Sequence, residues 1–393
     1  MRKIALPGSA CRLLSTRSRQ FSHSALVFSD SGPLSEPQSH PPSLHPVSVA
    51  AFSPRTAFTV PEIRDSYFLG HHNAALRAIQ SQIAAVGLVI ECRDLRLPLS
   101  SWNPTLDRAL ADTPRLVLYT KADLVADSSP TGALQSALAR FHAGPARRGT
   151  PLFWHKAAPA APVLRALRRA AAATDALTGL RVLVVGMPNV GKSSLLNKLR
   201  NEGMGGGMPK VAATANYPGV TRKLSTPVRV LGGKARPADD VPGEGVFLVD
   251  TPGVFMPYVA DKHVMLKLAL AHGIKDGIVP AEILADYLLY RMNLWDPQLY
   301  ARFCAPTNSI EELLQGVGRS TGKLANGLHQ AAAWLVAQWR MGNLGRYALD
   351  DVTKDTIQAK IDEFENPTVS YRQAKKQAKL ARKEMLAARH AET

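Results

Sequence analysis

Gly186-Met187-Pro188-Asn189-Val190-Gly191-Lys192-Ser193-Ser194 is the stretch that decides the fold of this chain of 393 residues. It follows an apolar run of strand length at 181–185 and opens a leucine-rich helical pattern. A glycine-containing loop between a strand and a helix lets backbone N–H groups wrap phosphates. In such a loop Lys192 reaches the β and γ phosphates, and the Ser193 hydroxyl ligates magnesium. The stretch therefore predicts a phosphate-binding loop.

A second stretch, Asp250-Thr251-Pro252-Gly253, directly follows the apolar run at 246–249. An aspartate at the tip of a strand can hold magnesium through water, and the N–H of Gly253 can sense a γ-phosphate. A plain turn would explain these residues if they stood alone. Paired with the phosphate loop, they form the expected second half of a nucleotide switch. Thr221 lies between the two stretches, where a switch segment places its magnesium-binding threonine.

The third stretch is Thr120-Lys121-Ala122-Asp123, which ends the apolar run at 116–119. It resembles the guanine-recognition motif Asn-Lys-x-Asp, with Thr120 in place of the usual Asn. The carboxylate of Asp123 would accept from the N1–H and exocyclic amine of guanine, which adenine lacks, while the stem of Lys121 would pack on the ring. A helix cap after a strand would explain an isolated instance.

Runs of strand length alternate with helical patterns over the middle of the chain, which is typical of an α/β unit with a largely parallel sheet. The six expected strands are 88–91, 116–119, 152–154, 181–185, 228–231 and 246–249, with a helix at 164–173. The order of the motifs is unusual, because the guanine motif of a Ras-like domain normally follows the phosphate loop. Here Asp123 precedes Lys192, which precedes Asp250. We therefore expect a circularly permuted Ras-like P-loop GTPase domain at 58–262.

Helical patterns dominate from residue 263 onward. Pro280 begins one helix, Ser309 with Glu312 makes a capping box for another, and a third covers 331–341 and stops at Gly342. We expect an all-helical domain at 263–350. A basic helical tail follows at 351–393.

The chain carries 48 Lys and Arg against 31 Asp and Glu, a formal charge of +17 with a pI near 10.0. Residues 1–57 hold +4 of this and residues 371–393 hold +5, so the middle keeps +8. Such a balance indicates a polyanionic partner, and nucleic acid and an anionic membrane surface both fit. The three cysteines lie far apart without C-x-x-C spacing, so neither a disulfide framework nor a zinc site is indicated.

The amino terminus has the composition of a mitochondrial transit peptide. Residues 1–30 are rich in Arg and Ser, with no acidic residue before Asp30. A merely disordered basic tail is the alternative. Residues 31–57, rich in Pro, Ser and His, are expected to be a disordered spacer. No apolar stretch approaches the ~18 residues of a spanning helix, so any membrane contact would be peripheral.

These motifs in this order resemble the circularly permuted GTPases of the YlqF/YawG group, and within it the mitochondrial ribosome-assembly type. The resemblance covers about 61–350. Phe68-Leu69-Gly70-His71 followed by Ala75 looks like the family's Phe-Pro-Gly-His-Met-x-Lys-Ala segment. The stretch from Glu91 to Pro98 looks like its Asp-Ala-Arg-Asp-Pro-Arg-x-Pro segment, and 340–345 is similar to its carboxyl-terminal Gly-Lys-Leu-Gly signature.

The resemblance implies a GTPase that binds GTP and GDP with magnesium, hydrolyses GTP, and promotes assembly of the large mitochondrial ribosomal subunit in support of mitochondrial translation. It implies that the helical domain contacts ribosomal RNA, and that the protein lies in the matrix, either free or peripherally on the inner membrane. An RNA-binding assembly factor with regulatory nucleotide binding and negligible hydrolysis is the alternative. A P-loop ATPase is disfavoured by Asp123, and a factor with a dead nucleotide site by the presence of Lys192, Ser193, Thr221 and Asp250.

Hydrolysis would need groups beyond these three motifs. Val254 follows Gly253 where small GTPases carry the glutamine that orients water, so we expect slow unaided hydrolysis. The resemblance points to His71 as a group that approaches the γ-phosphate; an ordinary histidine near a helix start is the alternative. It also implies that Asn189 could bind potassium, a cation that can stand in for an arginine finger.

Overall fold

The computed structural model describes residues 52–63, 70–110, 113–126, 132–143, 151–174, 177–212, 224–232, 241, 243–256, 259, 261–322, 327–366 and 376. Residues 52–393 form one compact unit. The predicted transit peptide, most of the predicted spacer and, apart from Lys376, the tail beyond 366 lie outside the described residues. So does Thr221, and the side chain of His71 is not among those described.

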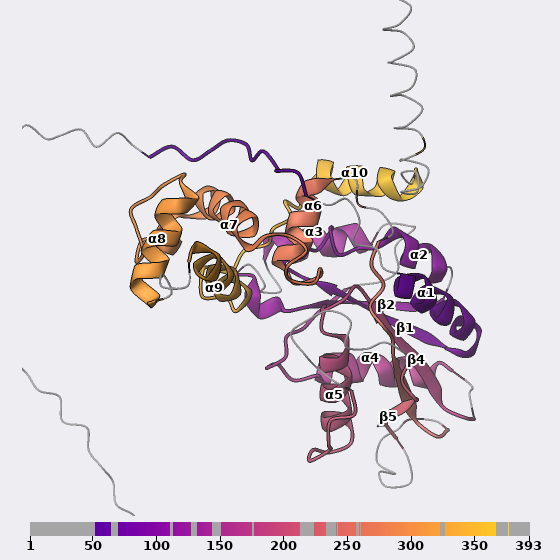
Figure 1. The fold of residues 1–393 in the computed structure, drawn as a ribbon. Helices are drawn as coiled ribbons and strands as arrows, with labels where there is room; N and C mark the ends of the chain where they lie inside the picture. Colours follow the sequence, from indigo (N-terminus) through magenta and orange to yellow (C-terminus); the bar gives the residue numbers. More distant parts are fainter. Residues whose placement is uncertain are drawn as a thin grey trace, which may run out of the picture. The chain divides into compact units, whose positions relative to one another are not determined.

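A six-stranded sheet with the order β3-β2-β1-β4-β6-β5 forms the centre of this unit (Figure 1). The strands are β1 (Leu88–Asp94), β2 (Arg115–Thr120), β3 (Leu152–Phe153), β4 (Leu180–Gly186), β5 (Val228–Leu231) and β6 (Val246–Asp250). All neighbours are parallel except β5, which runs antiparallel to β6. The six apolar runs are thus confirmed as strands of a largely parallel sheet. Such strands are apolar along their length because both faces are buried.

Helices cover both faces of the sheet. They are α1 (Gly70–Gln82), η1 (Ile83–Ala85), α2 (Pro104–Leu110), η2 (Ala122–Leu124), α3 (Ala133–His142), α4 (Ala161–Ala172) and α5 (Lys192–Gly203). Successive strand residues point to opposite faces. Val89 of β1 packs in a cluster with α1 and α2, whereas its neighbour Ile90 packs with α4 and α5. The result is a three-layer α/β/α arrangement.

Parallel strands end at the same edge of a sheet, and this edge gathers the predicted motifs. β2 ends at Thr120, β4 at Gly186 and β6 at Asp250. The chain proceeds outward from β1 to β2 and β3, then returns to place β4 on the other side of β1. Ligands of open α/β sheets bind outside the carboxyl ends of the strands where the order reverses. The reversal between β1 and β4 therefore marks this edge as the place for a site.

The later part of the chain is helical, as expected. Its elements are α6 (Lys262–Leu270), α7 (Ala281–Trp295), η3 (Pro297–Tyr300), α8 (Ile310–Thr321), α9 (Leu328–Arg340) and α10 (Lys354–Glu365). Pro280 is the N-cap of α7, as predicted. The Ser309 side chain accepts from the backbone N–H of Glu312, but the Glu312 carboxylate accepts from the Thr307 hydroxyl at 2.5 Å instead of returning to Ser309. Only one half of the predicted capping box therefore forms.

The helical part shares its core with the sheet. One continuous cluster of buried apolar side chains runs from Val184 in β4 and Leu195 in α5 to Tyr287 in α7 and Leu335 in α9. The guanidinium of Arg55, near the end of the predicted spacer, lies 2.6 Å from Asp286 Oδ1 of α7.

Among the described helices none has both the length and the apolar character needed to cross a membrane.

Candidate functional site

The loop between β4 and α5 has the backbone of an anion-binding turn. Asn189 and Gly191 have positive φ angles of 57° and 95°, and Gly191 is the N-cap of α5. Left-handed residues between a strand and a helix turn successive N–H groups toward one concavity, which the helix N-terminus makes more positive. The stretch from Gly186 to Ser194 therefore has the strand, left-handed residues and helix start that a phosphate-binding loop requires.

Lys192 is buried and lies across this loop. Its Nζ donates to the carbonyl oxygens of Met187 at 2.7 Å and Gly186 at 3.2 Å. Burial lowers the pKa of Lys192, while Asp250 opposes this shift. Within the described residues this ammonium donates to carbonyl oxygens, and a buried ammonium so placed gains electrostatically when an anion enters the loop. Lys192 is thus placed to bind phosphate oxygens.

Asp250 and Ser193 bring the end of β6 and the start of α5 together. Ser193 Oγ donates to Asp250 Oδ2 at 2.6 Å, and Asp250 sits in register with Val184 of β4. Burial raises the pKa of Asp250, with Lys192 acting in the opposite direction. Its other oxygen, Oδ1, is buried and has no hydrogen-bond partner among the described residues. A charged oxygen left in this state is costly unless a ligand supplies the missing interaction.

These oxygens suit magnesium. A serine hydroxyl beside a carboxylate is a hard-oxygen donor pair, and Mg²⁺ is commonly held by one or two such groups plus substrate phosphates. The described part of the chain contains no group of three or more His, Cys, Asp or Glu that could hold a metal by itself. Ser193 and Asp250 would therefore hold the ion together with phosphate oxygens.

Gly253 brings the segment after β6 against the phosphate loop. A Cβ at this position would lie 2.6 Å from both Cα and N of Pro188, closer than any side chain permits. Val254 N also donates to Gly186 O at 3.2 Å. A glycine is required here because two backbones approach each other. The backbone of Gly253 therefore lies directly against the phosphate loop.

Thr120 links the guanine-recognition stretch to the phosphate loop. Its Oγ1 lies 2.6 Å from Val190 O and 3.0 Å from Arg93 O, and its single proton serves one of these acceptors at a time. The side chain is buried. Its hydroxyl therefore reaches across β1 to the loop and fixes the two segments relative to each other.

Lys121 is the N-cap of the short helix η2, and Asp123 lies within η2. Lys121 has a φ of 57°, and its Nζ lies 2.8 Å from Asp94 Oδ2. Burial lowers the pKa of Lys121 to about 8, against the opposing effect of Asp94. Asp123 is exposed. The Asp123 carboxylate is therefore accessible to a ligand, whereas the ammonium of Lys121 is held by Asp94.

Asp94 is a residue of the site to which the sequence analysis assigned no role. Burial would raise its pKa, but Arg96 and Lys121 beside it hold that pKa well below its usual range. Arg96 NH2 lies 2.8 Å from Asp94 Oδ2 and also donates to Ala271 O, just after α6. The signal in the sequence was the Arg-Asp-x-Arg spacing, which places alternating charges at the end of a strand.

Asn189 connects the phosphate loop to the helical part. Its Nδ2 donates to His272 O at 2.8 Å, and His272 lies between α6 and α7 with a φ of 68°. Burial, together with Arg340, lowers the pKa of His272 to about 4. The amide nitrogen of Asn189 is thus engaged, whereas its oxygen is the atom that the potassium prediction requires.

His72 occupies a position that sequence reasoning missed. It is buried, and its Nδ1 lies 3.1 Å from Gly253 O and 3.4 Å from Phe255 N; the protonated Nδ1 donates to Gly253 O, and the unprotonated Nδ1 accepts from Phe255 N. His71, the residue predicted to act, precedes it as the second residue of α1, but its side chain lies outside the described part of the chain. The pair of adjacent histidines was the signal available.

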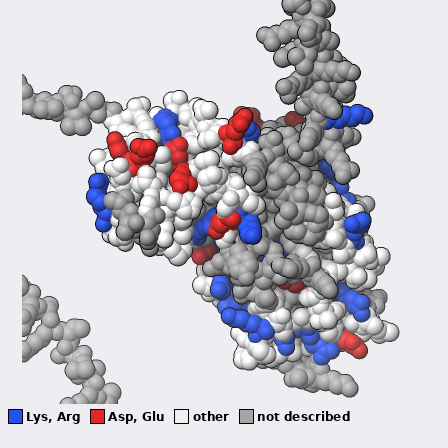
Figure 2. Space-filling view, in the orientation of Figure 1, with Lys and Arg blue, Asp and Glu red and all other residues white. Residues whose placement is uncertain are grey.

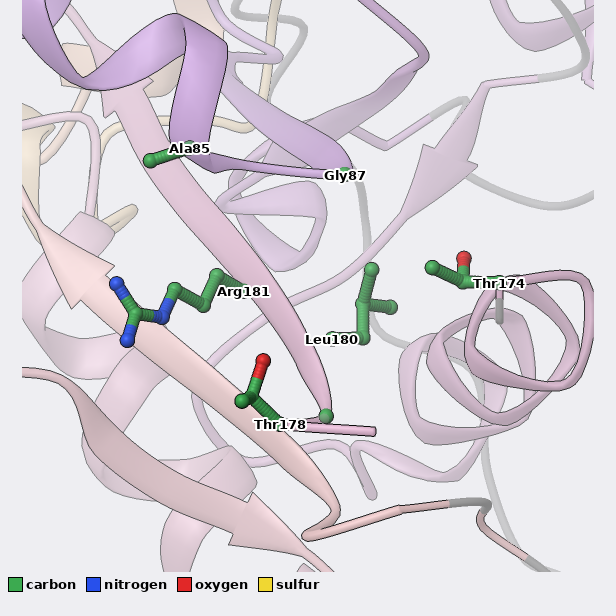
Figure 3. A pocket seen from close by; sticks show the side chains of 7 residues that line it. Ala85, Gly87, Thr174, Thr178, Leu180 and Arg181 are labelled. Atoms are coloured by element: carbon green, nitrogen blue, oxygen red, sulfur yellow. The ribbon is translucent and has the colours of Figure 1, made fainter. Parts of the chain in front are cut away.

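A separate pocket of about 350 Å³ lies away from these motifs (Figure 3). Leu180 and Arg181, which begin β4, line it together with Gly87 and Thr174. The phosphate loop follows the other end of β4. The pocket is therefore at the opposite edge of the sheet and does not belong to the site.

Comparison with known proteins agrees with this geometry. A family described as 50S ribosome-binding GTPase matches residues 181–291. Mitochondrial GTPase 1 of Schizosaccharomyces japonicus is 33% identical over 317 residues, which cover 75% of this chain and 93% of that protein. Mitochondrial GTPase 1 of Schizosaccharomyces pombe is 32% identical over 336 residues, covering 80% and 98%. Ribosome biogenesis GTPase A of Bacillus cereus is 30% identical over 294 residues, covering 72% and 93%.

Proposed function

The chain belongs to the family of mitochondrial GTPase 1 and ribosome biogenesis GTPase A, and we propose that it is a mitochondrial GTPase that promotes assembly of the large mitochondrial ribosomal subunit. The observation that carries the enzymatic part is the meeting of three motifs at one sheet edge. Ser193 contacts Asp250, Gly253 contacts Pro188, and Thr120 contacts Val190. The ribosomal part rests on the relatives' names and on the basic charge of the chain.

The domain is proposed to be a circularly permuted form of the Ras-like fold. The strand β2 that leads to the guanine loop precedes β4 and its phosphate loop in the chain, while β1 lies between them in the sheet. Thr120 Oγ1 lies 2.6 Å from Val190 O, so the guanine-recognition stretch and the phosphate loop are adjacent in space despite this order. The order of motifs along the chain and their adjacency in space support the proposal.

The residues that bind GTP and GDP are proposed as follows. The loop from Asn189 to Ser194 binds the phosphates, with Lys192 on the β and γ groups, and Asp123 binds guanine with Lys121 against the ring. Ser193, Asp250 and Thr221 hold magnesium, which neutralises charge on the phosphates. The N–H of Gly253 senses the γ-phosphate.

Hydrolysis is proposed to depend on groups supplied from outside the loop. Val254 follows Gly253 and is buried and apolar, so it cannot orient water. His71 at the start of α1 and a potassium ion on the amide oxygen of Asn189 are the proposed contributors, and the ribosome is the proposed activator. A trans-acting contribution to phosphoryl transfer is typically ~10³ to 10⁵ in rate.

The helical part, residues 263–350, is proposed to contact ribosomal RNA and to respond to whether GTP or GDP is bound. Asn189 contacts His272 and Arg96 contacts Ala271, so both the phosphate loop and the segment after β1 contact the turn after α6.

The proposed location of the protein is the mitochondrial matrix, with peripheral contact to the matrix side of the inner membrane. Residues 1–30 are proposed to direct import.

An RNA-binding factor with negligible hydrolysis is the second candidate, and buried Val254 is the observation that favours it. Turnover measured in potassium and in sodium, with and without the large mitochondrial subunit, separates the two. We expect stimulation by both potassium and the subunit. Equal rates in the two salts would remove Asn189 from the mechanism, and no response to the subunit would favour the second candidate.

A further inference from the structure

Basic charge is distributed unevenly between two parts of the chain. Residues 151–212, which contain α4 and α5, hold nine Lys and Arg against two Asp and Glu. Residues 261–340, which contain α6 to α9, hold eight against seven. The helical part therefore has almost no net charge, although it is the part expected to contact RNA. The charge that a polyanion would seek lies on the α4–α5 side of the sheet.

Helix α4 presents this charge on its outer side. Val163, Leu164 and Leu167 are buried against the sheet, whereas Arg165 and Arg169 are exposed. The two arginines are four residues apart, which places them one above the other on the same helix face. Among the described residues, neither has an ion-pair partner. Their guanidinium groups are thus available, and their planar geometry suits bidentate binding of phosphate.

Helix α5 extends the same surface through the contacts of Glu202. Glu202 Oε2 accepts from Ala160 N at the start of α4 at 2.6 Å, and its Oε1 lies 2.8 Å from Lys198 Nζ. The end of α5 and the start of α4 are therefore side by side. Because Glu202 is engaged by both partners, it offers little negative charge to repel a polyanion.

Two exposed lysines flank this junction. Lys156 precedes α4, and Lys210 follows α5. Figure 2 shows Lys and Arg gathered over the part of the molecule that carries α4 and α5 in Figure 1, while Asp and Glu gather over α7 and α8. We call the surface formed by Lys156, Arg165, Arg169, Lys198 and Lys210 the α4–α5 face.

We propose that the α4–α5 face binds the phosphate backbone of RNA. The inference rests on the proposed ribosomal function and assigns its main electrostatic contact to the GTPase domain and not to helices α6 to α9. RNA is favoured over a membrane because the apolar side chains of α4 point into the core, so this helix offers no apolar side chains for insertion into lipid. Phosphate neutralisation by Lys and Arg supplies most non-specific affinity for nucleic acid.

The test is a pair of matched charge reversals in the full chain lacking residues 1–30. Arg165→Glu with Arg169→Glu changes the α4–α5 face. Arg302→Glu with Arg319→Glu changes two exposed arginines of the helical part by the same charge. Binding is measured by fluorescence with a transcript of the large-subunit mitochondrial ribosomal RNA over a range of salt concentrations. GTP affinity and thermal unfolding confirm that each variant is folded.

We expect the reversal on the α4–α5 face to weaken RNA binding about tenfold or more and to lower the salt-dependence slope by about 2, with unchanged GTP affinity. The reversal in the helical part should change RNA affinity much less. Equal losses in the two variants, or no loss in the first, would overturn the proposal. If the Arg165/Arg169 variant fails to fold, Lys156→Glu with Lys210→Glu tests the same surface outside the helices.

Two further outcomes separate this inference from its premises. Vesicles of phosphatidylcholine and cardiolipin serve as the second probe. If the first variant loses vesicle binding but keeps RNA binding, the face meets a membrane and the proposal is wrong. If the wild-type chain binds neither the transcript nor the large subunit, the proposed ribosomal function itself fails.

Discussion

The nucleotide site and the α4–α5 face are both rich in charge, but they hold it in opposite ways. Lys192, Asp250 and Lys121 of the site are largely withdrawn from water and contact a named partner. Arg165 and Arg169 of the face are exposed and have no partner within the described residues. Buried charges interact strongly and depend on geometry, whereas exposed charges are screened by water and salt. Single substitutions should therefore have large effects in the site and small, additive effects on the face.

Lys192→Ala should have the largest effect. It removes the ammonium that lies across the phosphate loop, and charge-assisted hydrogen bonds of this kind contribute about 1.5–3 kcal/mol each. We expect GTP and GDP affinity to fall about 100-fold or more in equilibrium titration, with loss of turnover. Lys198→Ala, six residues on in the same helix and paired with Glu202, is the control and should leave nucleotide affinity unchanged. Similar losses in both would contradict the distinction between the two regions.

Asp123→Asn should change the preferred base. The carboxylate accepts from two guanine donors, whereas an amide donates at one of these positions, so xanthine nucleotides should gain as guanine nucleotides lose. A mismatched hydrogen bond of this type costs about 1–3 kcal/mol, or roughly 5- to 150-fold in affinity. Competition with GTP, XTP and ATP measures the change. If ATP competes with GTP equally in the wild type, the assignment of the stretch from Thr120 to Asp123 is wrong.

Gly253→Ala should disturb the site through packing alone. The added Cβ would lie 2.6 Å from the backbone of Pro188, so the segment after β6 must move away from the phosphate loop. Overpacking of this kind costs about 1–3 kcal/mol. We expect a lower melting temperature and a larger loss of affinity for a non-hydrolysable GTP analogue than for GDP, because the N–H of Gly253 is proposed to contact only the γ-phosphate. Equal losses for the two nucleotides would remove that contact.

Thr120→Val tests the link between the guanine loop and the phosphate loop. Valine has nearly the same shape but leaves the buried carbonyl of Val190 without its donor, at a cost of about 1–3 kcal/mol. Nucleotide affinity should fall about fivefold or more. Thr120→Asn, which restores the usual residue of the motif, should keep affinity near that of the wild type. A harmless valine together with a harmful asparagine would show that shape, not hydrogen bonding, matters here.

Arg169→Ala should have the smallest effect and so complete the comparison. An isolated exposed substitution usually changes stability by less than about 0.5 kcal/mol. We expect an unchanged free energy of unfolding in urea and an unchanged GTP affinity, with the salt slope for RNA binding lowered by about 1. A clear loss of stability would place Arg169 in the packing of α4 and remove it from the α4–α5 face.

Much of the site was accessible from sequence because it depends on local order. The phosphate loop needs a strand, left-handed residues and a helix in succession, and all three are encoded between residues 181 and 199. Asp250 was predicted for the same reason, since it ends a strand. Asp94 and His72 were missed as site residues, because their roles depend on Lys121 and Gly253, which lie far away in the chain.

The sequence by itself determined the strands, the motifs at their ends and the resemblance to a GTPase family, because these depend on residue order and on periodicity over short stretches. Only the tertiary structure decided which charges are held inside and which remain free. The contact between Asn189 and the turn after α6, and the engagement of Glu202 between α4 and α5, join residues more than forty positions apart. Such pairings follow from the way layers pack, and no local pattern encodes them.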